Sequence, residues 1–333
     1  MAVKPMRIPL YVTEPIHSEA EHLLRSKTDV AFGTEELTRE AVLERVAGAQ
    51  VILSKTDPVL IDAQLMTAAP ALRHVARHGT GYSNVDLDHA TRNGIAVSIA
   101  AGVNTGAISE YTIGLMFAAA RCLPQASAAC LNGTPDRQAF AGLEVTGKTF
   151  GIVGVGRIGR AVVERVTALG MRVLAHHPRP SSRGLSDLPL ELVGLERLLA
   201  ESDVISLHTP LTAETRNLIG ADQFARMKST AILLNLSRGG VVDEAALHDA
   251  LAEKRIFAAA TDVLANEPVR SSEPLLQMNN CIVLPHIAAM TFDTQRNIAM
   301  TAARQCLATL SGGIPDNVVN PDALEHPKWK DVH

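Results

Sequence analysis

Three residues with suitable chemistry for anion binding and proton transfer follow successive predicted strands in the second half of the chain. Arg238 follows AILLNLS, Glu267 lies in TDVLANEP, and His286 lies in VLPHIAAM. Arginine binds a planar carboxylate through two parallel hydrogen bonds, and histidine exchanges protons near neutral pH. Each residue taken alone is more often an ordinary surface or packed side chain. Because the carboxyl ends of parallel strands meet at one edge of a sheet, we expect the three to open onto the same crevice.

The element that must position a cofactor beside them is the segment TFGIVGVGRIGR, residues 149–160. A short apolar strand leads to Gly154, Gly156 and Gly159 and then to an amphipathic helix. In a dinucleotide-binding fold the first glycine makes the tight turn, the second lets the backbone approach a pyrophosphate, and the third lets the helix pack on the strand. The pyrophosphate then lies at the helix N-terminus. Since a further strand at 172–176 follows in register, the segment predicts a Rossmann unit.

The composition excludes several classes of protein. The chain has 333 residues, enough for two domains with cores of their own. Hydrophobic residues make up 47% but aromatic residues only 3%, which indicates aliphatic sheets covered by helices on both faces. A net charge of −4 gives no electrostatic basis for binding nucleic acid. No apolar run approaches the ~18 residues of a membrane span and the N-terminus lacks a signal-peptide pattern, so we expect a soluble, cytoplasmic protein without membrane contacts.

The four cysteines show no pattern of a metal site or of a disulfide framework. They are Cys122, Cys130, Cys281 and Cys306, with no CxxC pair among them. We therefore predict four buried thiols in a reducing compartment, and no metal.

Strands and helices alternate in short units along the first hundred residues. This alternation predicts a small α/β domain with a mostly parallel sheet. Predicted strands are 7–12, 50–54 and 73–77, and predicted helices are 18–24, 39–46, 62–67 and 86–93.

The alternation continues after the glycine-rich segment. Predicted strands are 204–208, 230–236, 257–261 and 281–284, with a helix at 243–253. A further helix, 291–310, has no strand after it, so we expect the chain to cross back to the first domain and make that domain discontinuous. The predicted domains are 1–102 with 290–333, and 103–289. The tail EHPKWKDVH is polar enough to be partly mobile.

Between the two domains lies a long alanine-rich helical stretch, 104–131, interrupted by little except Pro124. Such a helix carries the chain into the second domain and offers an apolar face to a partner subunit, which predicts a homodimer joined through residues 111–120. The alternative is a helix buried within its own monomer.

These segments together resemble the D-isomer-specific 2-hydroxyacid dehydrogenases, and among them the short phosphoglycerate dehydrogenase-like members. The resemblance covers nearly the whole chain. Its most specific segments are RHGTGYSNVDLDHATRNGI, FAGLEVTGKTFGIVGVGRIGR, HTPLTAETRNLIG, LNLSRGGVVDEAAL, ATDVLANEP and LPHIAAMT. The resemblance implies an α/β fold of two parallel-sheet domains, with a Rossmann dinucleotide-binding domain inserted into a discontinuous flavodoxin-like substrate domain.

The resemblance also implies residue roles. Arg238, Glu267 and His286 match the family's catalytic arginine, glutamate and histidine. Beside the three glycines of the Rossmann turn, the implied cofactor contacts are Thr80, Arg157, Ile158, Thr209, Leu236 and Asp262. The backbone at Gly79 and Gly81 is implied to bind the substrate carboxylate. The sequence departs from the family at Ser83, usually aspartate, at Ala288, often glycine, and at His177, usually acidic.

The expected reaction is reversible hydride transfer between a nicotinamide cofactor and a small 2-hydroxy or 2-keto acid. Arg238 holds the carboxylate and the keto oxygen, His286 is the general acid and base, and Glu267 orients its ring. A phosphite dehydrogenase-like enzyme is a second possibility, since such enzymes keep all three residues. Formate dehydrogenases carry glutamine in place of Glu267 and fit less well. A dinucleotide-sensing scaffold like the C-terminal-binding corepressors is the non-enzymatic alternative.

Two further predictions concern specificity. Lys55, in SKTDP, lies where related phosphoglycerate enzymes present a cation to phosphate, which favours a substrate with a second anionic group; a solvated lysine in a turn is equally consistent. His177 stands where an NAD enzyme has a carboxylate that binds the adenine ribose. Arg179 follows with Ser181, Ser182 and Arg183, which suit a 2′-phosphate. The pattern favours NADP as cofactor, with NAD as the alternative.

Overall fold

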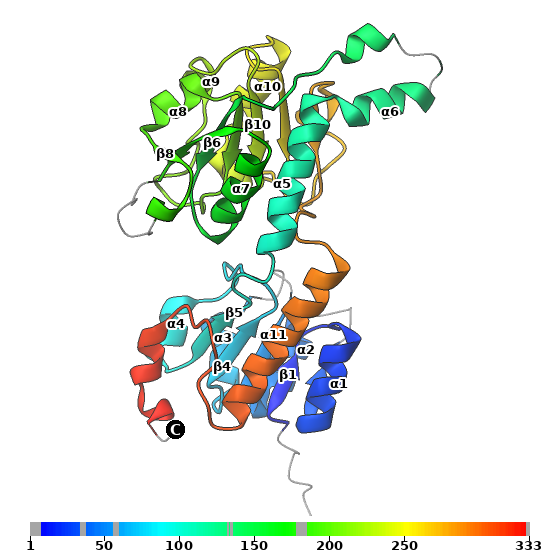
Figure 1. Ribbon diagram of the computed structural model, residues 1–333. Coiled ribbons are helices and arrows are strands. Elements are labelled where there is room, and N and C mark those ends of the chain that lie inside the picture. Colours follow the sequence, from blue (N-terminus) through cyan, green and yellow to red (C-terminus); the bar gives the residue numbers. More distant parts are fainter. Residues whose placement is uncertain are drawn as a thin grey trace, which may run out of the picture. The chain divides into compact units, whose positions relative to one another are not determined.

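The chain forms two compact units, each with its own parallel sheet (Figure 1). The computed structural model describes residues 8–33, 38–55, 60–131, 133, 136–177 and 185–330. Unit 1 comprises Met1–Asn104 and Thr291–His333, and unit 2 comprises Thr105–Met290. The C-terminal segment from Thr291 therefore belongs to the first unit.

Unit 1 has a five-stranded sheet in the order β2-β1-β3-β4-β5, with all neighbouring strands parallel. This is the order of flavodoxin-like sheets. The strands are β1 Leu10–Val12, β2 Val30–Phe32, β3 Val51–Ser54, β4 His74–Arg77 and β5 Ala96–Ile99. The helices are α1 Ser18–Lys27, α2 Arg39–Arg45, α3 Ala63–Ala68, α4 Leu87–Arg92 and α11 Phe292–Leu310, with short 3-10 helices at Val46–Gly48, Pro321–Glu325 and Pro327–Trp329.

Helices cover both faces of this sheet because its strands are apolar on both sides. Leu10 and Leu53 pack with α1 and α11 on one face. Tyr11 and Ile52, one residue away on each strand, pack with α2, α3 and α4 on the other. Side chains that alternate between faces account for this division.

Helix α11 is fastened to the sheet by a buried polar network. The imidazole of His74 in β4 lies 2.8 Å from Ser98 Oγ through Nε2 and 2.9 Å from Thr309 Oγ1 through Nδ1. Ser98 Oγ also donates to Gln305 Oε1 at 3.0 Å. Two residues of the helix thus bond to groups on β4 and β5, in addition to its apolar packing.

The C-terminal tail is packed on unit 1 up to residue 330. Trp329 is 4% exposed and its indole N–H donates to Gly94 O at 2.9 Å. One large aromatic side chain therefore holds the described part of the tail on unit 1, and partial mobility of the tail stays a prediction.

Unit 2 has a seven-stranded parallel sheet in the order β12-β11-β10-β9-β6-β7-β8. Counted from β6, this is the Rossmann order 3-2-1-4-5-6 with one more strand at the edge, so the predicted fold class is confirmed. The strands are β6 Thr149–Val153, β7 Arg172–His176, β8 Glu191–Leu192, β9 Val204–Leu207, β10 Ile232–Asn235, β11 Ala258–Thr261 and β12 Cys281–Val283. The helices are α5 Thr105–Ala120, α6 Leu123–Leu131, α7 Arg157–Ala168, α8 Leu195–Glu201, α9 Ala221–Phe224 and α10 Glu244–Ala252, with 3-10 helices at Arg137–Phe140, Leu185–Asp187, Gly239–Val241 and Pro274–Gln277.

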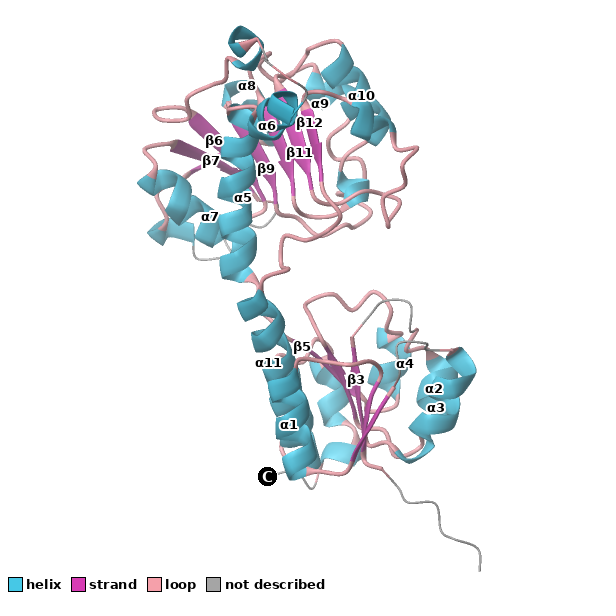
Figure 2. Ribbon diagram, turned by 90° about the vertical axis from the view of Figure 1, so that its right-hand side faces the viewer, coloured by secondary structure: helices cyan, strands magenta, loops and turns pink. Residues whose placement is uncertain are grey.

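Two layers of helices enclose the sheet of unit 2 (Figure 2). Helices α5 and α7 pack through residues such as Met116 and Val162 against one face. Helices α8, α9 and α10 pack through residues such as Leu198 and Leu247 against the other. The edge formed by the strand ends and their following loops is thereby left for a ligand.

The long helical stretch after residue 104 is two helices rather than one. Helices α5 and α6 meet at a bend of 60°. The break comes at Cys122, whose φ is +50°, and not at Pro124, which lies in the first turn of α6 where a missing N–H costs nothing. Within the described residues, no single helix is both long and apolar enough to cross a membrane; this bent pair meets that test jointly, by length and composition alone.

Two further expectations differ from the structure. Strands β2, β5 and β8 were not predicted. The prediction of four buried thiols holds for Cys281 and Cys306 but is wrong for Cys122, which is half-buried, and Cys130, which is exposed. Helix α6 has no buried side chain, so its cysteine faces outward.

Candidate active site

A glutamate and a histidine meet at the carboxyl edge of the unit 2 sheet. Glu267 follows β11 and His286 follows β12, which are neighbouring parallel strands. Their side chains form a hydrogen bond of 2.8 Å between His286 Nδ1 and Glu267 Oε2. The imidazole side chain is 51% exposed and the carboxylate 35%. Because Nδ1 is engaged, Nε2 is the ring atom left to exchange a proton with a ligand.

The backbone at His286 is held in an uncommon conformation by a buried aspartate. His286 has a φ of +59°, in the left-handed region that non-glycine residues rarely adopt. Asp262, at the end of β11 and 1% exposed, accepts the next two backbone N–H groups, from Ile287 at 2.9 Å and Ala288 at 2.8 Å. Burial raises the pKa of Asp262, and these two N–H donors act against that rise. Asp262 thus fixes the turn that presents His286.

Arg238 is presented at the same edge of the sheet by β10, the neighbour of β11 on the side away from β12. It follows β10, and its exposed side chain donates from Nη1 to the carbonyl oxygen of Ser237 at 2.7 Å. Asn235 shapes this loop, since its Oδ1 accepts from Ser237 Oγ at 2.8 Å and its Nδ2 donates to Arg238 O at 3.1 Å. The structure therefore places the three predicted residues after β10, β11 and β12, and it joins two of them directly.

The glycines after β6 fit a dinucleotide. Gly154 has a φ of +95°, and a Cβ there would lie 2.6 Å from His208 O, so only glycine is accommodated. A Cβ at Gly159 would lie 2.5 Å from Gly154 O, which shows how closely α7 packs on the strand. Gly156 faces open space and is the N-cap of α7 without a side-chain cap, so the first N–H groups of the helix are available to an anion.

Other predicted cofactor residues surround this turn. Thr209 follows β9, and its buried Oγ1 has no hydrogen-bond partner among the described residues, an unsatisfied group that a ligand could complete. Arg157 and Ile158 form the first turn of α7, and Leu236 is buried after β10. Since β6 and β9 flank the point where the strand order reverses, these residues lie where such sheets bind dinucleotides.

The residues predicted to select the adenine-ribose phosphate are only partly described. His177 follows β7 directly and is half-buried. Arg179 lies outside the described residues, as do its neighbours up to 184.

Unit 1 presents its own set of candidate residues after β3 and β4. Gly79 has a φ of +144°, and Arg77 donates from Nε to Gly81 O at 3.0 Å. Lys55 donates from Nζ to Pro15 O at 2.7 Å. Thr80 lies between the two glycines and is half-buried.

The charges in unit 1 favour an anion at this strand edge. Arg77 is 3% exposed and also donates from Nη1 to Ser54 Oγ at 2.9 Å. Burial, together with the positive charges of Lys55 and Arg77, lowers the pKa of His78 to about 4. The field of both cations therefore reaches the loop of Gly79 and Gly81.

Sequence reasoning missed Arg77 and the second role of Asp262. Arg77 could have been noticed as a charged residue closing an apolar strand, HVAR, which requires polar partners when buried. Asp262 was predicted as a cofactor contact, but both of its oxygens accept backbone N–H groups beside His286.

Comparison with known proteins agrees with this geometry. Residues 113–288 match the family described as D-isomer specific 2-hydroxyacid dehydrogenase, NAD binding domain. The glyoxylate reductase of Korarchaeum cryptofilum is 40% identical over 327 residues, which cover 96% of this chain and 98% of that protein. The chain belongs to the D-isomer specific 2-hydroxyacid dehydrogenase family. Unit 2 accordingly contains its NAD-binding domain.

Other members of the family are longer or differ more in sequence. A D-3-phosphoglycerate dehydrogenase of Archaeoglobus fulgidus is 40% identical over 316 residues, covering 94% of this chain but 59% of that protein, so the chain spans about three fifths of this relative. A solved structure of an NADPH-dependent glyoxylate/hydroxypyruvate reductase from Sinorhizobium meliloti is similar with a TM-score of 0.81 and 27% identity, covering 97% of this chain and 99% of that one.

Proposed function

We propose that this protein is a D-2-hydroxyacid dehydrogenase that transfers a hydride between a nicotinamide cofactor and a small 2-keto or 2-hydroxy acid. The observation that carries the proposal is the 2.8 Å bond between His286 and Glu267 on strands next to the one that presents Arg238. An anion-binding arginine and a histidine–carboxylate pair on one sheet edge suit a reaction in which a carboxylate is held and a proton moves.

Each of the three side chains has a distinct task in this reaction. A bound nicotinamide cofactor supplies or accepts the hydride. Arg238 binds the substrate carboxylate and keto oxygen, and its positive charge stabilises the negative charge that develops on that oxygen. His286 gives a proton from Nε2 to the same oxygen in reduction and removes it in oxidation. Glu267 holds Nδ1 and thereby orients the imidazole so that Nε2 faces the substrate.

The cofactor is NADP in preference to NAD. The end of β7 is followed by His177, so the carboxylate that normally binds both adenine-ribose hydroxyls, and would repel a 2′-phosphate, is missing from that position. Arg179 and the hydroxyls after it supply donors for that phosphate. The similar reductase from Sinorhizobium meliloti is described as NADPH-dependent, which supports this choice.

The substrate carries a second anionic group. Unit 1 serves as the substrate domain, with the backbone of Gly79 and Gly81 binding the carboxylate and Lys55 binding the second anion. The support is the positive field of Lys55 and Arg77 at the ends of β3 and β4. The substrates to compare are phosphohydroxypyruvate, which carries a second anionic group, and hydroxypyruvate and glyoxylate, which do not.

The protein is a cytoplasmic homodimer joined through α5 and α6. Helix α6 has no buried side chain, and Leu123 and Leu131 on it are 53% and 88% exposed. A groove of about 1040 Å³ in unit 2 is lined by both helices and by Phe140. The exposed leucines of α6 beside this groove support a subunit contact on this side of unit 2.

A turnover screen tests the proposed reaction. The purified protein is assayed with NADPH and NADH against glyoxylate, hydroxypyruvate and phosphohydroxypyruvate, and with NADP+ and NAD+ against phosphite. We expect steady reduction of at least one keto acid, and His286→Asn should lower kcat about 10²-fold or more while cofactor binding, followed by NADPH fluorescence, is unchanged. No turnover of any keto acid or of phosphite would indicate a sensing scaffold, and turnover of phosphite alone would indicate a phosphite dehydrogenase-like enzyme.

A further inference from the structure

The loop that carries Glu267 has no helix or strand of its own. Residues 262–268 follow β11 as turns and bends. Thr261 Oγ1 donates to Val263 O at 2.6 Å, and Leu264 N donates to Glu267 Oε1 at 3.1 Å. These bonds shape the loop from within, and bonds from other segments, such as those that join Asp262 to Ile287 and Ala288, hold it in place.

Such a bond comes from Glu244, the first residue of α10. Its Oε1 accepts the backbone N–H of Ala265 at 2.6 Å. The start of this helix is itself capped by Asp243, which accepts from the N–H groups of Ala245 and Ala246, both at 3.1 Å. Glu244 therefore ties the middle of the loop to a capped helix terminus.

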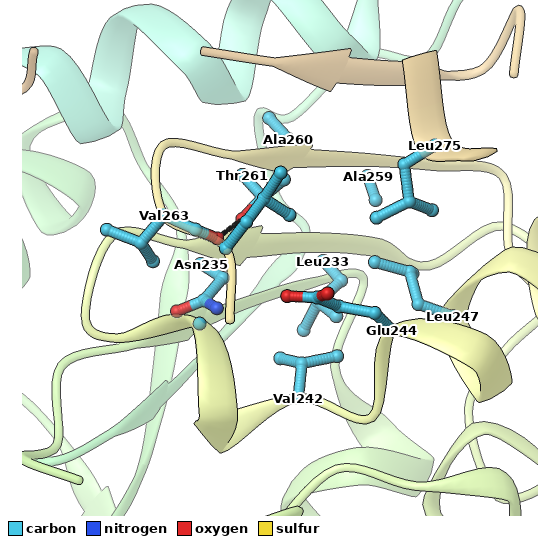
Figure 3. A pocket seen from close by; sticks show the side chains of 12 residues that line it. Leu233, Asn235, Val242, Glu244, Leu247, Ala259, Ala260, Thr261, Val263 and Leu275 are labelled. Carbon is cyan, nitrogen blue, oxygen red and sulfur yellow. Dashed lines mark hydrogen bonds between the residues drawn. The ribbon is translucent and has the colours of Figure 1, made fainter. Parts of the chain in front are cut away.

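The surroundings of Glu244 are unusual for a carboxylate. Figure 3 shows its side chain pointing into a small cavity of about 10 Å³ among apolar side chains that include Leu233, Leu247 and Leu275. Burial raises the pKa of Glu244. An apolar residue would fill this space at lower cost, so the acid is explained by the hydrogen bond that it makes to Ala265.

The backbone of this loop also packs against the loop that carries Arg238. A Cβ at Gly239, the residue after Arg238, would lie 1.9 Å from the carbonyl carbon of Leu264 and 2.2 Å from Ala265 N. The backbone that Glu244 holds is therefore in direct contact with the backbone next to Arg238. A shift of the loop would disturb the presentation of Glu267 and of Arg238 together.

We propose that Glu244 is a positioning residue for Glu267: by accepting the Ala265 N–H, it fixes the loop from which Glu267 orients His286. The inference rests on the proposed function, in which Glu267 and His286 are the proton-transfer pair. The task of Glu244 is to accept a hydrogen bond. A neutral oxygen at this position is therefore sufficient, and an apolar side chain of similar size is not.

Two substitutions separate the hydrogen bond from the charge. Glu244→Leu removes the acceptor and suits the apolar cavity, and we expect it to lower kcat about 10-fold or more, with cofactor affinity within about twofold of the native value. Glu244→Gln keeps an acceptor for Ala265 N–H and should retain kcat within about threefold. Glu40, an exposed acid in the first turn of α2, is the matched control, and Glu40→Leu should change kcat less than about twofold.

A double-mutant cycle shows whether Glu244 acts through Glu267. Glu267→Gln alone should lower kcat strongly, and adding Glu244→Leu to it should cost less than about twofold more. If Glu267→Gln keeps native kcat, the proposed function of the pair is wrong. If Glu267→Gln lowers kcat but Glu244→Leu has no effect or an additive one, the positioning role is wrong and the proposed function stands. If the leucine variant does not fold, Glu244→Gln decides, since a 10-fold loss of kcat there would overturn the inference.

Discussion

A buried neutral histidine should make the stability of unit 1 depend on pH. His74 lies inside the sheet, bonded to Ser98 and Thr309, and burial lowers its pKa from 6.5 to about 3. In the unfolded chain the same side chain titrates near its ordinary value. Between these two pKa values the unfolded state binds a proton that the folded state does not, so stability is full above about pH 6.5 and is lost as the pH falls toward 3.

The size of the effect follows from the two pKa values. Linkage gives a loss of about 2 kcal/mol from this one side chain between pH 7 and pH 5. Other titrating groups, among them the buried His208 of unit 2 with a pKa lowered to about 4, contribute to the native protein and to a variant alike. The contribution of His74 is therefore the difference between native protein and His74→Gln, and not the total pH dependence.

Urea unfolding followed by tryptophan fluorescence measures this difference. The chain has one tryptophan, Trp329, and it is buried in unit 1, so its emission reports on the relevant unit. Between pH 7 and pH 5 the unfolding free energy of the native protein should fall about 2 kcal/mol more than that of His74→Gln. His22→Gln, at an exposed position on α1, is the control and should follow the native protein. Parallel curves for native protein and His74→Gln would refute the reasoning.

Three further predictions concern activity. The native enzyme should prefer NADP by kcat/KM, and both His177→Asp and Arg179→Ala should shift that ratio toward NAD by about 10-fold; a native preference for NAD would contradict the cofactor proposal. Lys55→Ala should raise KM about 10-fold for phosphohydroxypyruvate and less than about twofold for glyoxylate, and equal effects on both would exclude a second anion site there. Gly239→Ala should lower the unfolding free energy by about 1–3 kcal/mol together with kcat, because its Cβ meets backbone at 1.9 Å, whereas Gly106→Ala, with no atom within 4 Å, should be tolerated.

Much of the fold could be predicted from the sequence because its signals are local. Gly154 and Gly159 are required by a positive φ and by close backbone approach, so the type of residue itself reveals the turn. The short strands β2 and β8 gave no such signal, since pairing with a neighbouring strand, rather than their own pattern, makes them strands. The stretch 104–131 was predicted as one helical stretch, and no residue type signals its break at Cys122, which adopts a positive φ without being glycine.

The site could be predicted less completely. Glu267 and His286 could be assigned to one sheet edge because parallel strands share their carboxyl ends, and the structure adds their direct contact. Their catalytic roles stay predictions until the variants are measured. The contacts of Asp262 and Glu244 could not be foreseen, because their partners are backbone N–H groups, which every residue except proline has and which leave no mark in the sequence.

The return of the chain to unit 1 has a consequence for synthesis on the ribosome. Unit 2 is one continuous segment, Thr105–Met290, so it can complete its core as soon as that segment has emerged. Unit 1 cannot, because α11 supplies one wall of its core and is made only after unit 2. Until α11 is made, Leu10 and Leu53 lack the apolar side chains of that helix, although the strands of their sheet are already present. Strands β1 and β3 therefore reach their native surroundings only after unit 2 has been made, and until then the emerging chain lacks helix α11, Phe292–Leu310, to cover an apolar face of their sheet.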